Sequence, residues 1–213
     1  FGGSQPHAYI SGGAALNQEV ETLLKDIGFN FTVGYGATEC APLISCEDWK
    51  SFVPTSCGKV VNRMTVKINS RNPYDIPGEI LVKGQNVMPG YFKNPEATDE
   101  TLKDGWYHTG DLGIIDRHGN IFIKGRIKNM LLSGNGQNIY PEEIEFLLGK
   151  IEEIKECFVY GKKPENDKKN EKELIITVKA IPNHDKIKEL YGEKTDLEIY
   201  DIIWKKIKEV NKE

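Results

Sequence analysis

The chain has 213 residues, of which 38% are hydrophobic and 28% are charged, so a folded protein with a sizeable core is expected. Its net charge of −4 and its pI of about 5.7 argue against a nucleic-acid partner, because proteins that bind the phosphate backbone concentrate Lys and Arg. No apolar run approaches the roughly 20 residues that a membrane-spanning helix requires, which excludes an integral membrane protein.

The four cysteines, Cys40, Cys46, Cys57 and Cys157, lack the CxxC spacing of metal or redox sites. Reduced thiols in a cytoplasmic protein are therefore a better interpretation than disulfides. Residues 162–173 are rich in lysine, but acidic residues are interleaved with the lysines. This pattern favours a solvated surface loop over a binding patch.

The first part of the chain has the pattern of a βαβ-like unit. Residues 7–10 alternate in polarity and predict a strand, and the small residues of 11–16 follow it as a turn that a ligand could approach closely. Residues 18–27 carry apolar side chains at helical spacing and end at Gly28, and residues 29–33 predict a second strand. In open α/β sheets, ligands bind just past the carboxyl ends of such strands.

Residues 34–39 follow the second strand and combine chemically useful side chains with two glycines. Tyr35 offers an aromatic face, Thr38 a hydroxyl that can hydrogen-bond a phosphate, and Glu39 a hard carboxylate oxygen that suits Mg²⁺. Taken alone, the stretch fits a tight turn with incidental polar residues better than it fits a site.

From about residue 50 the pattern changes to short alternating runs at 64–68, 79–83 and 114–123, separated by Pro- and Gly-containing turns. Such runs predict a small β-barrel or sandwich. Asp111 could accept hydrogen bonds from a ribose diol, and Arg126 offers a planar fork of donors for ribose or phosphate oxygens.

The residues after about 126–129 mix helical and strand patterns. Pro141 suits the first position of a helix that extends to about Ile151. Residues 157–160 and 174–181 predict strands, and residues 200–210 predict a final amphipathic helix whose apolar stripe packs in the core.

Several stretches together resemble the adenylate-forming, AMP-binding enzymes, which include acyl-CoA synthetases, peptide-synthetase adenylation domains and luciferases. The stretches, in family order, are residues 11–16, 35–39, 90–98, 105–111, 125–129 and 139–145. Within that group, the sequences of residues 1–3, 11–17 and 86–98 are most similar to those of bacterial long-chain fatty acyl-CoA synthetases.

The resemblance implies a mixed α/β fold in three parts. Residues 1–48 would end a large N-terminal α/β nucleotide-binding domain, and residues 49–126 would form a small distorted β-barrel subdomain. Residues 127–213 would be a truncated, mobile α+β C-terminal domain with its hinge near Lys128.

The same resemblance implies a role for each matching residue. Adenine would lie between the turn of Gly12, Gly13 and Ala14 and the aromatic ring of Tyr35, next to Gly36. The catalytic residues would be Thr38, on the phosphate and the acyl carbonyl, and Glu39, on Mg²⁺. Asp111 and Arg126 would grip the ribose, Ile123 would pack near the nucleotide, Lys128 would be the hinge, and Gly136 would line the coenzyme A tunnel. His108 fits packing beside Trp106 and Tyr107 as well as it fits catalysis, so we leave it out of the predicted site.

The implied reaction uses ATP, Mg²⁺ and coenzyme A to turn a carboxylic acid, here a long-chain fatty acid, into an acyl-adenylate and then a thioester. We expect the chain to be a C-terminal piece of such a ligase without useful adenylation activity alone, because the family's phosphate loop and terminal catalytic lysine have no counterpart in these residues. An adenylation domain that loads a carrier protein and a non-catalytic nucleotide-binding relative stay open as alternatives. The resemblance also allows the parent protein to associate peripherally with a membrane.

Overall fold

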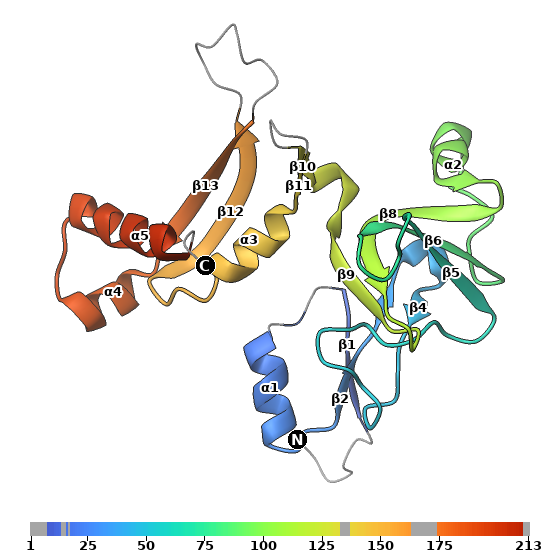
Figure 1. Cartoon of the computed structure of the whole chain (residues 1–213), viewed down its shortest axis with the longest axis horizontal. Coiled ribbons are helices and arrows are strands. Elements are labelled where there is room, and N and C mark those ends of the chain that lie inside the picture. Colours follow the sequence, from blue (N-terminus) through green and yellow to red (C-terminus); the bar gives the residue numbers. More distant parts are fainter. Residues whose placement is uncertain (1–7, 14–15, 17, 133–136, 163–173, 211–213) are drawn as a thin grey trace, which may run out of the picture. The chain divides into compact units, whose positions relative to one another are not determined.

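The computed structural model describes residues 8–13, 16, 18–132, 137–162 and 174–210. The chain divides into two compact units, Phe1–Ile127 and Lys128–Glu213, which we call unit 1 and unit 2 (Figure 1). Among the described residues, no helix has both the length and the apolar composition that crossing a membrane requires.

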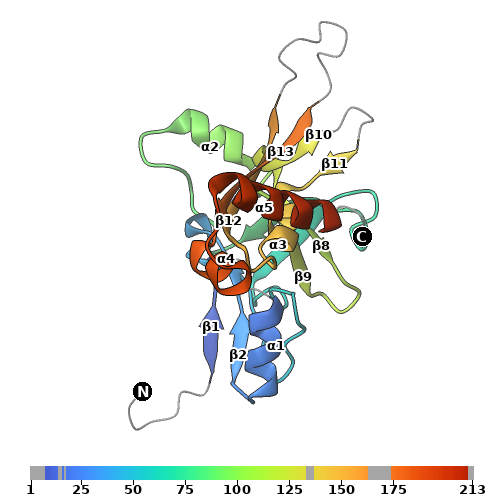
Figure 2. The same ribbon diagram turned by 90° about the vertical axis from the view of Figure 1, so that its left-hand side faces the viewer.

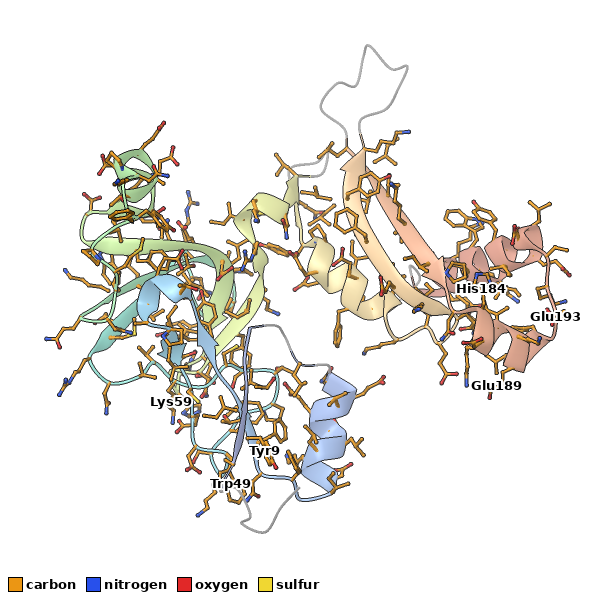
Figure 3. All side chains as sticks on the ribbon, turned by 180° about the vertical axis from the view of Figure 1, so that it is seen from behind. Tyr9, Trp49, Lys59, His184, Glu189 and Glu193 are labelled. Carbon is orange, nitrogen blue, oxygen red and sulfur yellow. The ribbon has the colours of Figure 1, made fainter. Side chains whose placement is uncertain are left out.

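Unit 1 opens with a βαβ arrangement, as the sequence predicts. Strands β1 (Tyr9–Ser11) and β2 (Phe31–Val33) are parallel, and α1 (Gln18–Asp26) connects them and lies beside them (Figures 1 and 2). Tyr9 at the start of β1 stacks on Phe29, with 4.6 Å between the ring centroids (Figure 3). Because the strands are parallel, the turns after them adjoin: the Gly34 amide donates to the Ser11 carbonyl over 2.8 Å.

The rest of unit 1 is a curled antiparallel sheet. Its strands are β5 (Met64–Asn69), β6 (Gly78–Gly84), β7 (Leu102–Lys103), β8 (Trp106–Ile115) and β9 (Ile121–Arg126). The long strand β8 pairs with β6 along one edge and with β7 and then β9 along the other. This sheet is the element that the sequence predicts as a small distorted barrel.

A separate hairpin packs its apolar residues into the curled sheet. It consists of β3 (Tyr35–Gly36), the 3₁₀ helix η1 (Thr38–Cys40) and β4 (Leu43–Ser45). Ile44 of β4 is fully buried in one cluster with Ile80, Val82 and Ile121 of the sheet, and Tyr35 also belongs to this cluster. The hairpin that carries Thr38 and Glu39 is therefore held against the sheet that carries Asp111 and Arg126.

The sequence analysis does not predict helix α2 (Pro95–Thr101), which lies between β6 and β7. Asn94 caps it by accepting from the Ala97 amide, and Pro95 occupies the first turn, where its missing N–H costs nothing. Seven residues give too little periodicity for a helix to be recognised from apolar spacing.

Unit 2 packs helices on one face of a two-stranded antiparallel sheet. Its elements are η2 (Ile127–Asn129, which crosses the unit boundary), β10 (Leu131–Leu132), β11 (Asn138–Ile139), α3 (Pro141–Leu148), β12 (Ile154–Lys162), β13 (Ile175–Pro182), α4 (His184–Tyr191) and α5 (Asp196–Val210). Residues of α3, α4 and α5, including Leu148, Ile187 and Ile203, share one core with Val159 of β12. Helix α4, which begins at His184 (Figure 3), is a second helix that the sequence analysis does not predict.

Candidate nucleotide-binding site

Unit 1 contains a polar cavity of about 690 Å³. Its lining brings together five residues that the sequence assigns to one nucleotide site: Gly36, Thr38, Glu39, Asp111 and Arg126. They come from the β3–η1 hairpin, from β8 and from β9, so only the packing of these elements makes them neighbours.

Asp111 occupies the wall of the cavity formed by β8 and β9. It lies opposite Arg126 in the strand register, and Arg126 Nε is 3.2 Å from its Oδ1. Tyr35 Oη donates to the other carboxylate oxygen over 2.7 Å. Asp111 is only 9% exposed, whereas 60% of the Arg126 side chain is accessible and can turn its remaining donors to a ligand.

Tyr35 is largely buried, and its ring belongs to the core cluster of unit 1. Burial, with the negative charge of Asp111 adding to it, raises the pKa of the Tyr35 hydroxyl well above its ordinary value. The hydroxyl therefore stays a proton donor to Asp111 at every physiological pH. The predicted stacking of adenine against this ring stays a prediction.

The turn that presents Asp111 is held by its own neighbours. Thr109 Oγ1 donates to the Ile80 carbonyl over 2.8 Å and accepts from the Asp111 amide over 3.0 Å. Glu79 accepts from the Gly110 amide over 3.2 Å through one oxygen, and its other oxygen lies 2.9 Å from His108 Nδ1. His108 thus lies at the cavity wall, bound to a carboxylate that also holds the turn.

Glu39 lines the same cavity from η1. Tyr91 Oη donates to Glu39 Oε1 over 2.8 Å. The pKa of Glu39 is lowered, first by the hydrogen bond from its own backbone amide and then by that of Tyr91, so the carboxylate is ionised near neutral pH. Thr38 beside it is exposed to the cavity.

Gly36 is required where the hairpin narrows before η1. A Cβ built on it would lie 2.1 Å from the Pro42 carbonyl oxygen, closer than any side chain can approach. The Ala37 amide donates to the same carbonyl over 2.8 Å, which closes the loop that carries Thr38 and Glu39.

Ten further lining residues have no role in the site that the sequence predicts. They are Ala37, Glu79, Tyr91, Glu100, Thr101, Lys103, Tyr107, His108, Thr109 and Gly110. Ala37, Tyr91 and residues 107–110 lie within stretches that carry the family resemblance, which is the signal that could have pointed to them. Glu79, Glu100, Thr101 and Lys103 reach the cavity through sheet pairing and through the unpredicted helix α2.

The remaining predicted site residues lie elsewhere, and their roles stay predictions. Gly12 follows β1 in the turn next to Gly34, and a Cβ on Gly12 would lie 3.2 Å from the Gly34 carbonyl oxygen. Gly13 is exposed with a φ of +87°, a conformation that favours glycine. Ile123 packs against the core of unit 1, and the exposed Lys128 is the first residue of unit 2. Ala14 and Gly136 lie outside the described residues.

Comparison with known proteins bears directly on this site. Residues 3–92, which include β1, the β3–η1 hairpin and Tyr91, match the family described as AMP-binding enzyme. These residues belong to the AMP-binding enzyme family. The match covers the wall of the cavity that carries Thr38 and Glu39.

Curated relatives align with most of this chain. A long-chain-fatty-acid–CoA ligase of Escherichia coli is 38% identical over 164 residues, which are 74% of this chain and 29% of the relative. A feruloyl-CoA synthase of Amycolatopsis is 37% identical over 159 residues, 71% of this chain and 32% of the relative. The chain thus spans about a third of the length of these curated relatives.

The fold has a close counterpart in a solved structure of an adenylate-forming enzyme. O-succinylbenzoate coenzyme A synthetase of Bacillus subtilis, in complex with ATP and a magnesium ion, superposes with a TM-score of 0.73. The two chains are 26% identical, and the superposition covers 89% of this chain and 40% of the synthetase.

Proposed function

We propose that this chain supplies one part of the nucleotide site of an ATP-dependent, AMP-forming acid–CoA ligase. The observation that carries the proposal is the single cavity in which Thr38 and Glu39 face the Asp111–Arg126 pair. One side offers a hydroxyl and an ionised carboxylate, which suit phosphates and their cation, and the other offers an acceptor and a guanidinium, which suit a ribose.

The residues fit Mg·ATP on chemical grounds. Glu39 is a hard oxygen ligand that hydrogen bonds keep ionised, and Mg²⁺ is commonly held by one or two carboxylates together with substrate phosphates. When bound, Mg²⁺ would neutralise phosphate charge. Asp111 has its carboxylate oriented from both sides, so its remaining lone pairs can accept from ribose hydroxyls.

In the proposed reaction, an oxygen of the substrate carboxylate attacks the α-phosphorus of ATP, and pyrophosphate leaves. The thiolate of coenzyme A then attacks the acyl carbon, and AMP leaves with the electrons of the acyl–oxygen bond. The residues of this chain bind and orient the nucleotide in both steps, and Arg126 and Thr38 stabilise charge near it.

For the acid, we propose a long-chain fatty acid, on the resemblance of residues 11–17 and 86–98 to bacterial long-chain synthetases. An aryl acid is the second candidate, because a feruloyl-CoA synthase is similar to this chain to almost the same degree. A panel of fatty and aryl acids assayed for thioester formation by the whole protein distinguishes the two. We further propose a cytoplasmic location, with peripheral membrane association of the whole protein as part of the same hypothesis.

Binding of ATP to residues 1–213 tests the nucleotide site directly. Arg126→Gln should weaken the affinity measured by titration calorimetry about tenfold, since it removes a charged donor from ribose or phosphate. Arg117→Gln is the matched control, because it makes the same charge change at the exposed far end of the β8–β9 hairpin. Equal affinities of the two variants would contradict the proposed site.

A further inference from the structure

One continuous segment contacts the short helix η1 at three points. Asn86 Nδ2 donates to the Cys40 carbonyl over 2.6 Å, and the Met88 amide donates to the Glu39 carbonyl over 2.7 Å. The third contact is the 2.8 Å hydrogen bond from Tyr91 Oη to the Glu39 side chain. We call residues 86–98 the arm. The arm thus forms hydrogen bonds with both the backbone and the carboxylate of Glu39.

Helix η1 needs such support. It has only three residues, and its hydrogen-bond geometry is intrinsically poor. The residue that follows it is Ala41, whose φ of 54° is unfavourable for a residue with a side chain. The side chain of Ala37 cannot cap the helix, and no side-chain cap is present. Hydrogen bonds within the hairpin close this loop, and partners from outside the hairpin add to them at Glu39.

The arm is itself rigidly built around Tyr91. The Tyr91 amide donates to Thr98 Oγ1 over 2.9 Å, and that hydroxyl donates to the Asn94 carbonyl over 2.8 Å. Gly90 has a φ of +152°, and a Cβ there would lie 2.8 Å from Thr98 Cγ2. Helix α2, capped by Asn94, thus closes a loop that holds Tyr91 in place.

We infer that Tyr91 is a positioning residue, held by the arm, that orients the Glu39 carboxylate for a divalent cation bound to the nucleotide phosphates. Tyr91 is one of three donors to this carboxylate, with the Glu39 amide and the Tyr107 hydroxyl. A carboxylate has about four lone-pair sites, so it can accept these bonds and still bind a cation. The inference rests on the proposed function, because it assumes that Glu39 meets Mg·ATP in the cavity. In this inference, Gly90, Asn94 and Thr98 of the arm serve to hold Tyr91.

Titration calorimetry of residues 1–213 with ATP, in the presence of Mg²⁺ and in its absence with EDTA, tests this inference. Tyr91→Phe should weaken binding of Mg·ATP by roughly three- to tenfold, since it removes one hydrogen bond to a charged group. Its affinity for ATP without Mg²⁺ should be unchanged. Tyr74→Phe, in an exposed loop that does not line the cavity, is the matched control.

A second variant approaches the same point through the arm. Thr98→Val removes the hydroxyl that accepts from the Tyr91 amide and should lower the Mg²⁺-dependent affinity in the same direction. A merely structural role of Tyr91 would lower the melting temperature and leave the ratio of the two affinities unchanged, which would overturn the inference.

Glu39→Gln separates this outcome from failure of the proposed function. If the original chain gains no affinity from Mg²⁺, or if Glu39→Gln keeps that gain, the cation role of Glu39 itself is wrong. If Glu39→Gln loses the gain and Tyr91→Phe keeps it, only the role of Tyr91 is wrong.

Discussion

Replacing Tyr35 with phenylalanine tests whether the core of unit 1 and the nucleotide site share one hydrogen bond. The change removes only the hydroxyl that donates to Asp111 over 2.7 Å, a short distance typical of a charged acceptor. Asp111 is 9% exposed, so water replaces the lost donor poorly. We expect the free energy of unfolding of unit 1 to fall by about 1.5–3 kcal/mol, the range for hydrogen bonds to charged groups.

The ion pair with Arg126 does not protect against this loss. Arg126 approaches the other oxygen at 3.2 Å, and its side chain is 60% exposed, so it contributes at most about 1 kcal/mol. The buried Tyr35 hydroxyl should therefore contribute more to the free energy of unfolding than the Arg126–Asp111 salt bridge does. Arg126→Gln should lower stability by less than Tyr35→Phe does, while weakening ATP binding more.

Urea denaturation followed by tryptophan fluorescence measures the effect. A Trp204→Phe background is used because Trp204 lies on α5 of unit 2, whereas Trp49 and Trp106 report on unit 1. Tyr74→Phe is the control, since an exposed site should change stability by no more than about 0.5 kcal/mol. A loss below about 0.5 kcal/mol for Tyr35→Phe would refute the reasoning.

Two further predictions concern stability. The pKa values of the Tyr35 hydroxyl and of the Tyr107 hydroxyl are raised, first by burial, so the folded protein keeps protons that the unfolded chain loses above its ordinary tyrosine pKa of about 10. The free energy of unfolding of unit 1 should therefore be unchanged below pH 10 and fall above it, by up to about 1.4 kcal/mol per pH unit for each tyrosine. Urea denaturation at pH 9 and at pH 10.5 measures this fall. Equal free energies of unfolding at the two pH values would contradict the prediction. Ile80→Ala and Ile187→Ala, at fully buried positions of units 1 and 2, should each cost about 2–5 kcal/mol in their own unit, and differential scanning calorimetry should show one transition moved by each.

Local pattern was enough to predict elements that obey one simple rule. Helix α1 has helical apolar spacing and ends before Gly28, and α3 begins at Pro141 as expected, although it ends at Leu148 rather than near Ile151. The parallel pairing of β1 with β2 follows from the strand–helix–strand order. Helices α2 and α4 are short and depend on an asparagine cap, a signal that is too common to predict a helix by itself.

The site is harder to predict, because its contacts join distant parts of the chain. Tyr35 and Asp111 are 76 residues apart, and Tyr91 and Glu39 are 52 apart. Motif resemblance pointed to Thr38, Glu39, Asp111 and Arg126, since each lies within a recognisable stretch, and the four line one cavity. It could not identify Glu79, whose contact with Gly110 follows from the pairing of β6 with β8. The partners that orient a site come from tertiary packing, which local patterns do not encode.

The strand register of β9 separates the candidate nucleotide site from the predicted hinge. Arg126 is the last residue of β9 and is held opposite Asp111 by the ladder with β8, whereas Lys128, two positions later, begins unit 2. A change of backbone dihedral angles at Lys128 need not break the ladder that ends at Arg126, because rotation about one residue leaves the geometry of the chain before that residue intact. If Lys128 is the hinge that the family resemblance implies, unit 2 could change its orientation between two half-reactions while Asp111 and Arg126 keep their geometry on the same nucleotide.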